Sequence, residues 1–252
     1  MGKLIPISAR SDRKSDWAGF VCFSLWTAFN VALAVGVFRR APIAAIFFLP
    51  TFAHEALIAL SFLMRKPLLK QAEGWAPRLA AYVATFMTPA FFFFSSRWKP
   101  EWVHPSPPAL FVGGVFLWLV GAYVGLWSLL SLRRAFSIVP QARTLVTRGP
   151  YRLARHPVYA SYLLQYGGVA LSHLSFPLAT VFFAWLGIVM LRISHEEKVL
   201  AATFPEYAEY RRRVGTFAPR FIAAREPAIA VPDPPRYGPV TEVSKAKAGA
   251  RP

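Results

Sequence analysis

Four long runs without Asp, Glu, Lys or Arg dominate this chain of 252 residues. They cover residues 17–38, 41–63, 79–96 and 108–132, apart from His54 and Glu55 in the second run. Each run has about 20 residues, which is the length that a helix needs to cross the hydrocarbon core of a bilayer. The pattern therefore predicts an all-α, polytopic integral membrane protein with four long spans.

The composition supports this prediction. Only 16% of the residues are charged, against roughly 25% in an ordinary soluble domain. The net charge is +17, but the basic residues lie between the apolar runs, so we expect no nucleic-acid partner. The first run has 22 uncharged residues, more than the roughly 7–15 of a cleavable signal, and we interpret it as a retained span. Cys22, the single cysteine, excludes an intramolecular disulfide and a multi-cysteine metal site, and we expect no metal.

The second half of the chain is organised differently. A polar, basic segment follows residue 132, and two shorter apolar runs at 158–174 and 178–193 predict a C-terminal helical hairpin, either fully spanning or re-entrant. Prolines and basic residues then indicate a disordered tail. We expect three regions: transmembrane helices at 1–132, the hairpin and a following amphipathic helix at 133–222, and a basic tail at 223–252.

The distribution of Lys and Arg predicts the orientation. These residues are concentrated before the first span, between spans two and three, after span four and after the hairpin. Basic loops stay on the cytoplasmic side. Both termini and residues 133–156 should therefore be cytoplasmic.

Two polar clusters flank the hairpin. Arg155 and His156 precede the first helix, and Glu196 and Glu197 follow the second apolar run. At about 1.5 Å per residue the two helices rise and return by roughly 28 and 30 Å, so both clusters should meet at one membrane depth. Pro157 suits the first helical position and leaves the next amides free to face an anion. Such a site has a cationic and an anionic side, which suits a zwitterionic amino-acid group.

An alternative interpretation is structural. Charged residues and tyrosines are common at helix ends near a bilayer surface, and Arg192 can pair with Glu196 at a spacing of four residues. After the Glu pair an aromatic stripe recurs at helical spacing, with Arg211 to Arg213 beside it. Its members are Leu200, Phe204, Tyr207, Tyr210 and Val214. The stripe predicts an amphipathic helix that lies on the membrane and closes over the hairpin mouth.

The order of motifs in this region resembles a known family. It reads LRRAFSI (132–138), LVTRGPYRLARHPVY (145–159), HEEKVL (195–200), FPEYAEYRRRV (204–214) and a closing proline at 219. The combination is similar to the isoprenylcysteine carboxyl methyltransferases and the related phospholipid N-methyltransferases, integral membrane enzymes that use S-adenosylmethionine. Ser161 and Pro205 replace glycines of the family pattern. These departures indicate a bacterial-type member, in the inner membrane, whose substrate need not be a prenylated protein.

The resemblance implies roles for individual residues. The cofactor-binding set expected around S-adenosylmethionine is Tyr151, Arg155, His156, Tyr159, Glu196, Glu197 and Tyr210. Arg134 and Ser137 match a position that leads into the site and would contact the methyl acceptor, a lipophilic carboxylate or amine. A protonated amine needs a base, for which Glu197 or Glu196 is the candidate.

Two other functions compete with methyl transfer. An NADPH-dependent membrane reductase of the steroid or sterol type also has an RHP-like element, usually followed by Asn where this chain has Val158. A non-enzymatic scaffold that binds anionic lipid is the third hypothesis. The resemblance offers nothing at His54 and Glu55, which are equally compatible with an intramembrane site and with structural hydrogen bonds.

Overall fold

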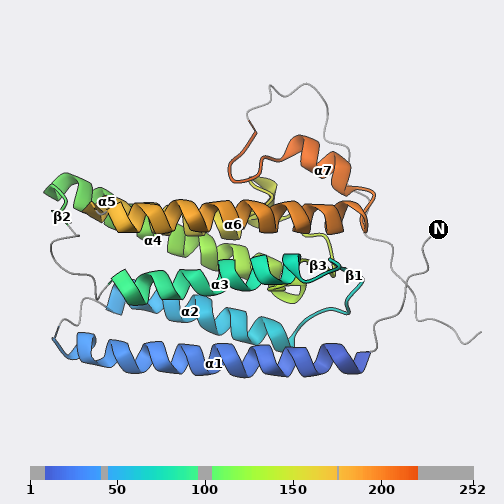
Figure 1. The fold of residues 1–252 in the computed structure, drawn as a ribbon, viewed down its shortest axis with the longest axis horizontal. Helices are drawn as coiled ribbons and strands as arrows, with labels where there is room; N and C mark the ends of the chain where they lie inside the picture. Colours follow the sequence, from blue (N-terminus) through green and yellow to red (C-terminus); the bar gives the residue numbers. More distant parts are fainter. Residues whose placement is uncertain (1–8, 41–44, 96–103, 175, 221–252) are drawn as a thin grey trace, which may run out of the picture. The chain divides into compact units, whose positions relative to one another are not determined.

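The computed structural model describes residues 9–40, 45–95, 104–174 and 176–220, and this part of the chain is mostly helical, as predicted (Figure 1). The helices are α1 (Ala9–Arg40), α2 (Ala45–Leu63), α3 (Ala76–Ser95), α4 (Pro108–Leu132), α5 (Pro157–Ser172), α6 (Phe176–Ala201) and α7 (Tyr207–Arg213). Two 3-10 turns, η3 (Arg133–Ala135) and η4 (Gly149–Arg152), lie between α4 and α5. The predicted tail at 223–252 lies outside the described residues.

Four two-residue strands tie the loops together. β1 (Lys70–Gln71) pairs with β3 (Gln141–Ala142), and β2 (His104–Pro105) pairs with β4 (His173–Leu174), both antiparallel. Figure 1 shows β1, β3, α7, the starts of α1, α3 and α5, and the ends of α2, α4 and α6 at one end of the helical bundle. The structure therefore places both polar clusters at this end, which we call the site end.

Within the described residues, two helical segments are long and apolar enough to cross a membrane. They are Pro108–Ala135 and Phe176–Ala201, and Leu49–Leu63 is a shorter apolar helix. The first three predicted spans coincide with α1, α2 and α3, except that residues 41–44 and 96 lie outside the described part. Their helical conformation is confirmed, and their passage through a membrane stays a prediction.

The predicted hairpin differs from the structure in its packing. α5 packs chiefly along α4, and α6 packs chiefly along α3. Bulky side chains fill the space between α5 and α6: the rings of Tyr166 and Trp185 lie 4.6 Å apart, and Trp185 Nε1 donates to the Ala84 carbonyl at 3.2 Å. The two helices are thus neighbours in sequence, but each has its closest contacts elsewhere.

Small residues explain why α5 prefers α4. Gly114 and Gly121 on α4 face Gly168 and Ser161 on α5, and a Cβ added at Gly121 would lie 2.7 Å from the Ser161 carbonyl oxygen. Backbones approach this closely only where side chains are absent or small, a common feature of membrane helix pairs. Gly168 makes this close approach, whereas a Cβ at its neighbour Gly167 would meet nothing within 4 Å.

The predicted amphipathic helix from Glu196 to Val214 is wrong as a continuous element. α6 ends at Ala201, and α7 begins only at Tyr207. Pro205 lacks an N–H and its ring clashes with a preceding helical turn, so the aromatic stripe is divided between two helices. Val214 follows the end of α7 in extended conformation.

Replacing Gly167 and Gly168 of α5, one at a time, by alanine tests the close packing of α4 and α5. A Cβ at Gly168 would press on the Gly114 carbonyl oxygen and lie 2.8 Å from the Trp118 nitrogen, whereas a Cβ at Gly167 meets nothing within 4 Å. Gly168→Ala should lower the free energy of unfolding by about 1–3 kcal/mol, as overpacking does. Gly167→Ala should leave it unchanged or raise it by up to about 1 kcal/mol. Thermal unfolding in detergent measures both, and equal behaviour of the two variants would contradict the packing.

Candidate functional site

The chain between α4 and α5 folds so that Arg155 and His156 precede the first turn of α5. Gly149 adopts a φ of +62°, a conformation that favours glycine, and opens η4. Pro157 is the first residue of α5. The Arg155 and His156 amides donate to the Gly215 and Thr216 carbonyls at 2.8 and 3.0 Å. The segment after α7 is thereby fixed against the start of α5.

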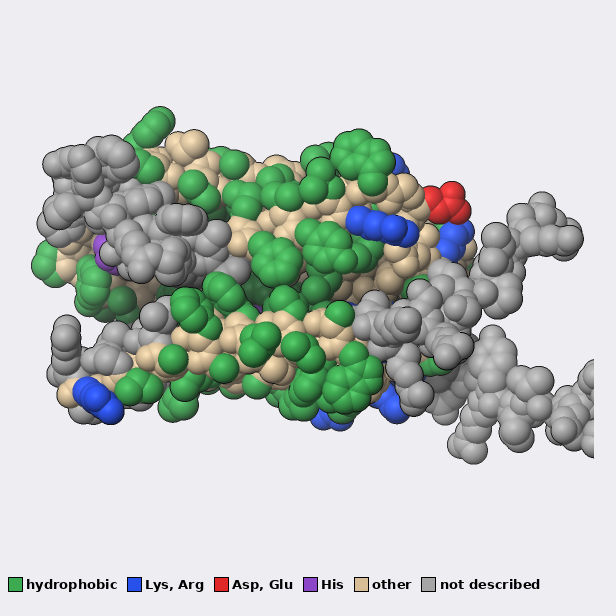
Figure 2. All heavy atoms as spheres, turned by 60° about the horizontal axis from the view of Figure 1, so that its bottom comes forward, with side chains coloured by type: hydrophobic (Ala, Val, Ile, Leu, Met, Phe, Trp, Pro, Cys, Tyr) green, Lys and Arg blue, Asp and Glu red, His purple; other side chains and the backbone are tan. Residues whose placement is uncertain are grey.

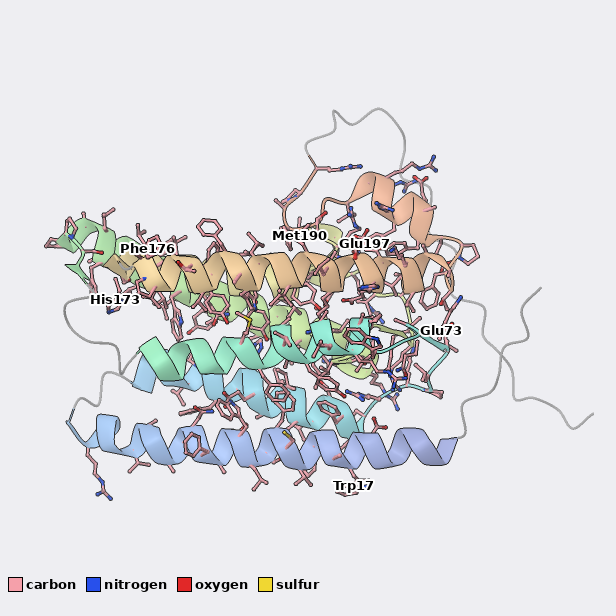
Figure 3. All side chains as sticks on the ribbon, in the orientation of Figure 1. Trp17, Glu73, His173, Phe176, Met190 and Glu197 are labelled. Carbon is pink, nitrogen blue, oxygen red and sulfur yellow. The ribbon has the colours of Figure 1, made fainter. Side chains whose placement is uncertain are left out.

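Glu197 connects three parts of the chain. Its Oε1 accepts from Arg155 Nε at 2.9 Å and lies 3.2 Å from His156 Nε2, while its Oε2 lies 3.4 Å from Arg211 Nε. Arg155 also donates to the Val214 carbonyl. We call Glu197 with its three partners Arg155, His156 and Arg211 the Arg155–Glu197 clasp. Figure 3 shows Glu197 on α6 beside α7.

The clasp gives Glu197 a structural role. Both carboxylate oxygens face guanidinium groups, and Arg155 and His156 are buried. Such pairing stabilises the ionised carboxylate and occupies its lone pairs. The geometry therefore disfavours the predicted catalytic role of Glu197 as a base.

Glu196 has different surroundings. Its Oε2 accepts a hydrogen bond from the Tyr159 hydroxyl at 3.2 Å, and the Tyr159 ring stacks on His156 with ring centroids 5.7 Å apart. Glu196 and Tyr159 line a cavity at the site end, called the site cavity below. Successive residues on a helix point about 100° apart, which explains why the two glutamates face different partners.

The structure brings most of the predicted cofactor-binding residues to the site cavity. Those that line it are Tyr151, Arg155, His156, Tyr159, Glu196 and Tyr210. Tyr210 donates its hydroxyl proton to the Tyr151 carbonyl at 2.7 Å. Burial raises the pKa of both tyrosines above the ordinary value, so both remain neutral hydrogen-bond donors at physiological pH.

The structure places Arg134 outside the lining of the site cavity, and its contact with the acceptor stays a prediction. α4 ends at Leu132, and Arg133 turns the chain with a φ of 37°. Arg134 is exposed, donates from Nε to the Met64 carbonyl at 3.1 Å and does not line the site cavity. Ser137 does line it, and donates to Gln141 Oε1 at 2.7 Å.

Arg192 is the site residue that the sequence reasoning missed. It is buried, lines the site cavity and donates to the Ala81 carbonyl at 3.2 Å and to Thr85 Oγ1 at 2.8 Å. In the described part of the chain it forms no ion pair with Glu196, the partner that spacing suggested. Its position at the end of the apolar run of α6 is the signal that could have identified it, because a buried cation beside such a run is costly.

One family model matches the middle of the chain. Residues 109–207 match the family model described as phospholipid methyltransferase, which confirms the resemblance for this segment. It contains α5, most of α4, all of α6 and the start of α7. Among the described residues, no group of three His, Cys, Asp or Glu side chains is placed to hold a metal ion.

Two curated bacterial relatives are similar over about half of the chain. The cobalt-zinc-cadmium resistance protein CzcN of Cupriavidus metallidurans is 38% identical over 146 residues, which are 57% of this chain and 63% of that protein. The nickel-cobalt-cadmium resistance protein NccN of Alcaligenes xylosoxydans xylosoxydans is 30% identical over 133 residues, 52% of this chain and 58% of that protein. The similarity thus spans less than two thirds of either relative.

Removing the clasp carboxylate should destabilise the fold. Glu197→Ala leaves Arg155 buried without its anion, and breaking a buried pair in this way costs about 3–5 kcal/mol. The matched control is Glu209→Ala, since Glu209 pairs with Arg212 and Arg213 at an exposed position on α7. Thermal unfolding should show a large decrease in unfolding temperature for Glu197→Ala and a small decrease for Glu209→Ala. Equal losses would contradict a structural clasp.

Proposed function

We propose that this chain, with a segment of the phospholipid methyltransferase family at its site, transfers a methyl group from S-adenosylmethionine to a lipophilic acceptor at a membrane. The observation that carries the proposal is the pair of opposite charges in the site cavity. Arg192 and Glu196 lie one helical turn apart on α6, both line the cavity and they do not pair with each other. A ligand with both a carboxylate and an ammonium group complements them.

The residues present fit the amino-acid end of this cofactor. Arg192 Nε is buried and has no hydrogen-bond partner among the described residues, so the guanidinium retains a donor for a carboxylate. Glu196 is positioned by Tyr159 and would accept from the ammonium group or a ribose hydroxyl. The amide N–H groups in the first turn of α5, which begins at Pro157, also favour an anion. Bound S-adenosylmethionine supplies a methyl group activated by the sulfonium.

The chain's own contribution is orientation and exclusion of water. α7 and the segment after it are fixed over the start of α5 by the clasp and by the backbone bonds to Gly215 and Thr216. The lone pair of the acceptor's oxygen or nitrogen would form the new bond to the methyl carbon. The carbon–sulfur bond would break at the same time, and the electron pair of that bond would stay on sulfur. Such a displacement depends mainly on holding the reacting atoms about 3–3.5 Å apart.

The proposal includes a membrane setting. The four long apolar runs and the hairpin form the spans of a helical bundle in a bacterial inner membrane, with both termini and the site end on the cytoplasmic side. The distribution of basic residues supports this orientation. The names of the relatives suggest that the modified lipophilic acceptor serves metal tolerance.

Binding of S-adenosylhomocysteine tests the cofactor assignment. We expect a micromolar Kd for the detergent-purified protein by calorimetry. Arg192→Gln and Glu196→Gln should each weaken binding by about 10- to 100-fold, the range of one charge-assisted hydrogen bond. Arg152→Gln and Glu206→Gln are matched controls, because both side chains are exposed and lie outside the cavity lining.

Two outcomes would overturn the assignment. Binding of NADPH in place of S-adenosylhomocysteine would favour the reductase. Binding of neither ligand by folded protein would favour the lipid-binding scaffold.

A further inference from the structure

A second cavity lies deeper in the bundle, between α1, α2, α3, α4 and α5. Its lining is largely apolar. Leu25, Phe29 and Phe86 line it and are also among the exposed large hydrophobic side chains, so the cavity reaches the lateral surface of the bundle. Figure 2 shows that hydrophobic side chains cover much of the face turned forward in that view. In a membrane, this surface would face lipid tails.

The second cavity is lined by the carboxylate of Glu55, of which only one oxygen accepts hydrogen bonds from described residues. Glu55 Oε1 accepts hydrogen bonds from Trp26 Nε1 at 2.9 Å and from Asn30 Nδ2 at 3.2 Å. Its Oε2 is buried and has no hydrogen-bond partner among the described residues. A purely structural carboxylate would satisfy both oxygens, because an unpaired anion inside a membrane protein is costly. Hydrogen bonds fix Oε1, and Oε2 could accept a hydrogen bond from a ligand that carries N–H or O–H groups.

The second cavity adjoins the site cavity. Phe23, Ile58, Thr85 and Tyr162 line both. Tyr162 is fixed by its hydroxyl, 2.8 Å from His54 Nε2, and Thr85 accepts from Arg192. A ligand in the second cavity therefore adjoins the place proposed for the cofactor's amino-acid end.

We propose that this second cavity binds the methyl acceptor and that Glu55 selects acceptors with a primary or secondary amine on a hydrocarbon chain. The proposal rests on the proposed function and narrows its acceptor class. The chain would lie in the apolar part of the cavity, and the ammonium group would donate to Glu55 Oε2. A lipophilic carboxylate would place a second anion beside Glu55, which disfavours it.

Glu55 also provides a destination for the proton. An ammonium nitrogen has no lone pair and cannot accept a methyl group. Transfer of one proton from the ammonium to Glu55 Oε2 leaves a neutral amine and a neutral carboxylic acid. The amine lone pair then forms the nitrogen–methyl bond as the carbon–sulfur bond breaks, which yields a methylated ammonium and a neutral thioether.

The test compares dodecylamine with dodecanoic acid on protein reconstituted in phosphatidylcholine nanodiscs. The first readout is the rise in unfolding temperature caused by each probe without cofactor. The second is transfer of radiolabelled methyl from S-adenosylmethionine to each probe. The variants are Glu55→Gln, which keeps an oxygen for Trp26 and Asn30, and Glu73→Gln as a control, an exposed carboxylate outside both cavities.

Dodecylamine should stabilise the wild type and the Glu73→Gln variant and should be methylated by both. Glu55→Gln should abolish this stabilisation and lower kcat/KM for the amine at least tenfold. Its Kd for S-adenosylhomocysteine should stay within twofold of the wild type. Its unfolding temperature without probe should be equal or higher, because an unpaired buried charge is removed.

Persistence of the amine effect in folded Glu55→Gln protein would overturn the proposal, as would stabilisation or methylation with dodecanoic acid alone. Absence of amine stabilisation in the wild type would overturn it as well. The proposed function fails separately, through loss of S-adenosylhomocysteine binding to the wild type, because the stabilisation readout needs no cofactor.

Discussion

The shared carboxylate of Glu197 holds the site end together. It lies near the end of α6 and contacts Arg155 at the start of α5 and Arg211 on α7. Arg155 also donates a hydrogen bond to the Thr216 hydroxyl, and the Thr216 carbonyl accepts a hydrogen bond from the His156 amide. Residues from α6, α7 and the segment before α5 thus meet at one carboxylate. A buried ion pair is not by itself a source of large net stability, but it specifies which segments meet.

The neighbouring glutamate takes no part in the clasp. Because Glu197 is occupied by the clasp, Glu196 turns to the site cavity, where Tyr159 orients it and Arg192 lies one turn away. The division explains how two adjacent carboxylates on α6 have different surroundings. One pairs within the clasp, and the other faces the site cavity. Glu55 in the second cavity is similar, because only one of its two carboxylate oxygens accepts hydrogen bonds from described residues.

The sequence predicts much of this architecture because its strongest signals are local. Uncharged runs marked the helices, and helix length alone placed His156 and Glu196 at one end of the bundle. The close pairing of α4 with α5 was not predictable, because it depends on Gly114 and Gly121 meeting Ser161 and Gly168 on a helix more than 30 residues away. Local spacing likewise favoured pairing of Arg192 with Glu196.

The other differences have the same origin. Thr85 and the Ala81 carbonyl, both on α3, bind the Arg192 guanidinium, and the short helix α7 returns Arg211 to Glu197. These contacts are tertiary, so no periodicity in α6 reveals them. Pro205 was visible in the sequence, but the aromatic stripe continued past it with helical spacing and hid the break.

The most direct test of the account is an experimental structure of the protein in nanodiscs with S-adenosylhomocysteine bound. We expect the carboxylate of the ligand to contact Arg192 and its ammonium or ribose group to contact Glu196, with the Arg155–Glu197 clasp intact. A ligand bound outside the site cavity, or bound by Glu197 with the clasp opened, would contradict it.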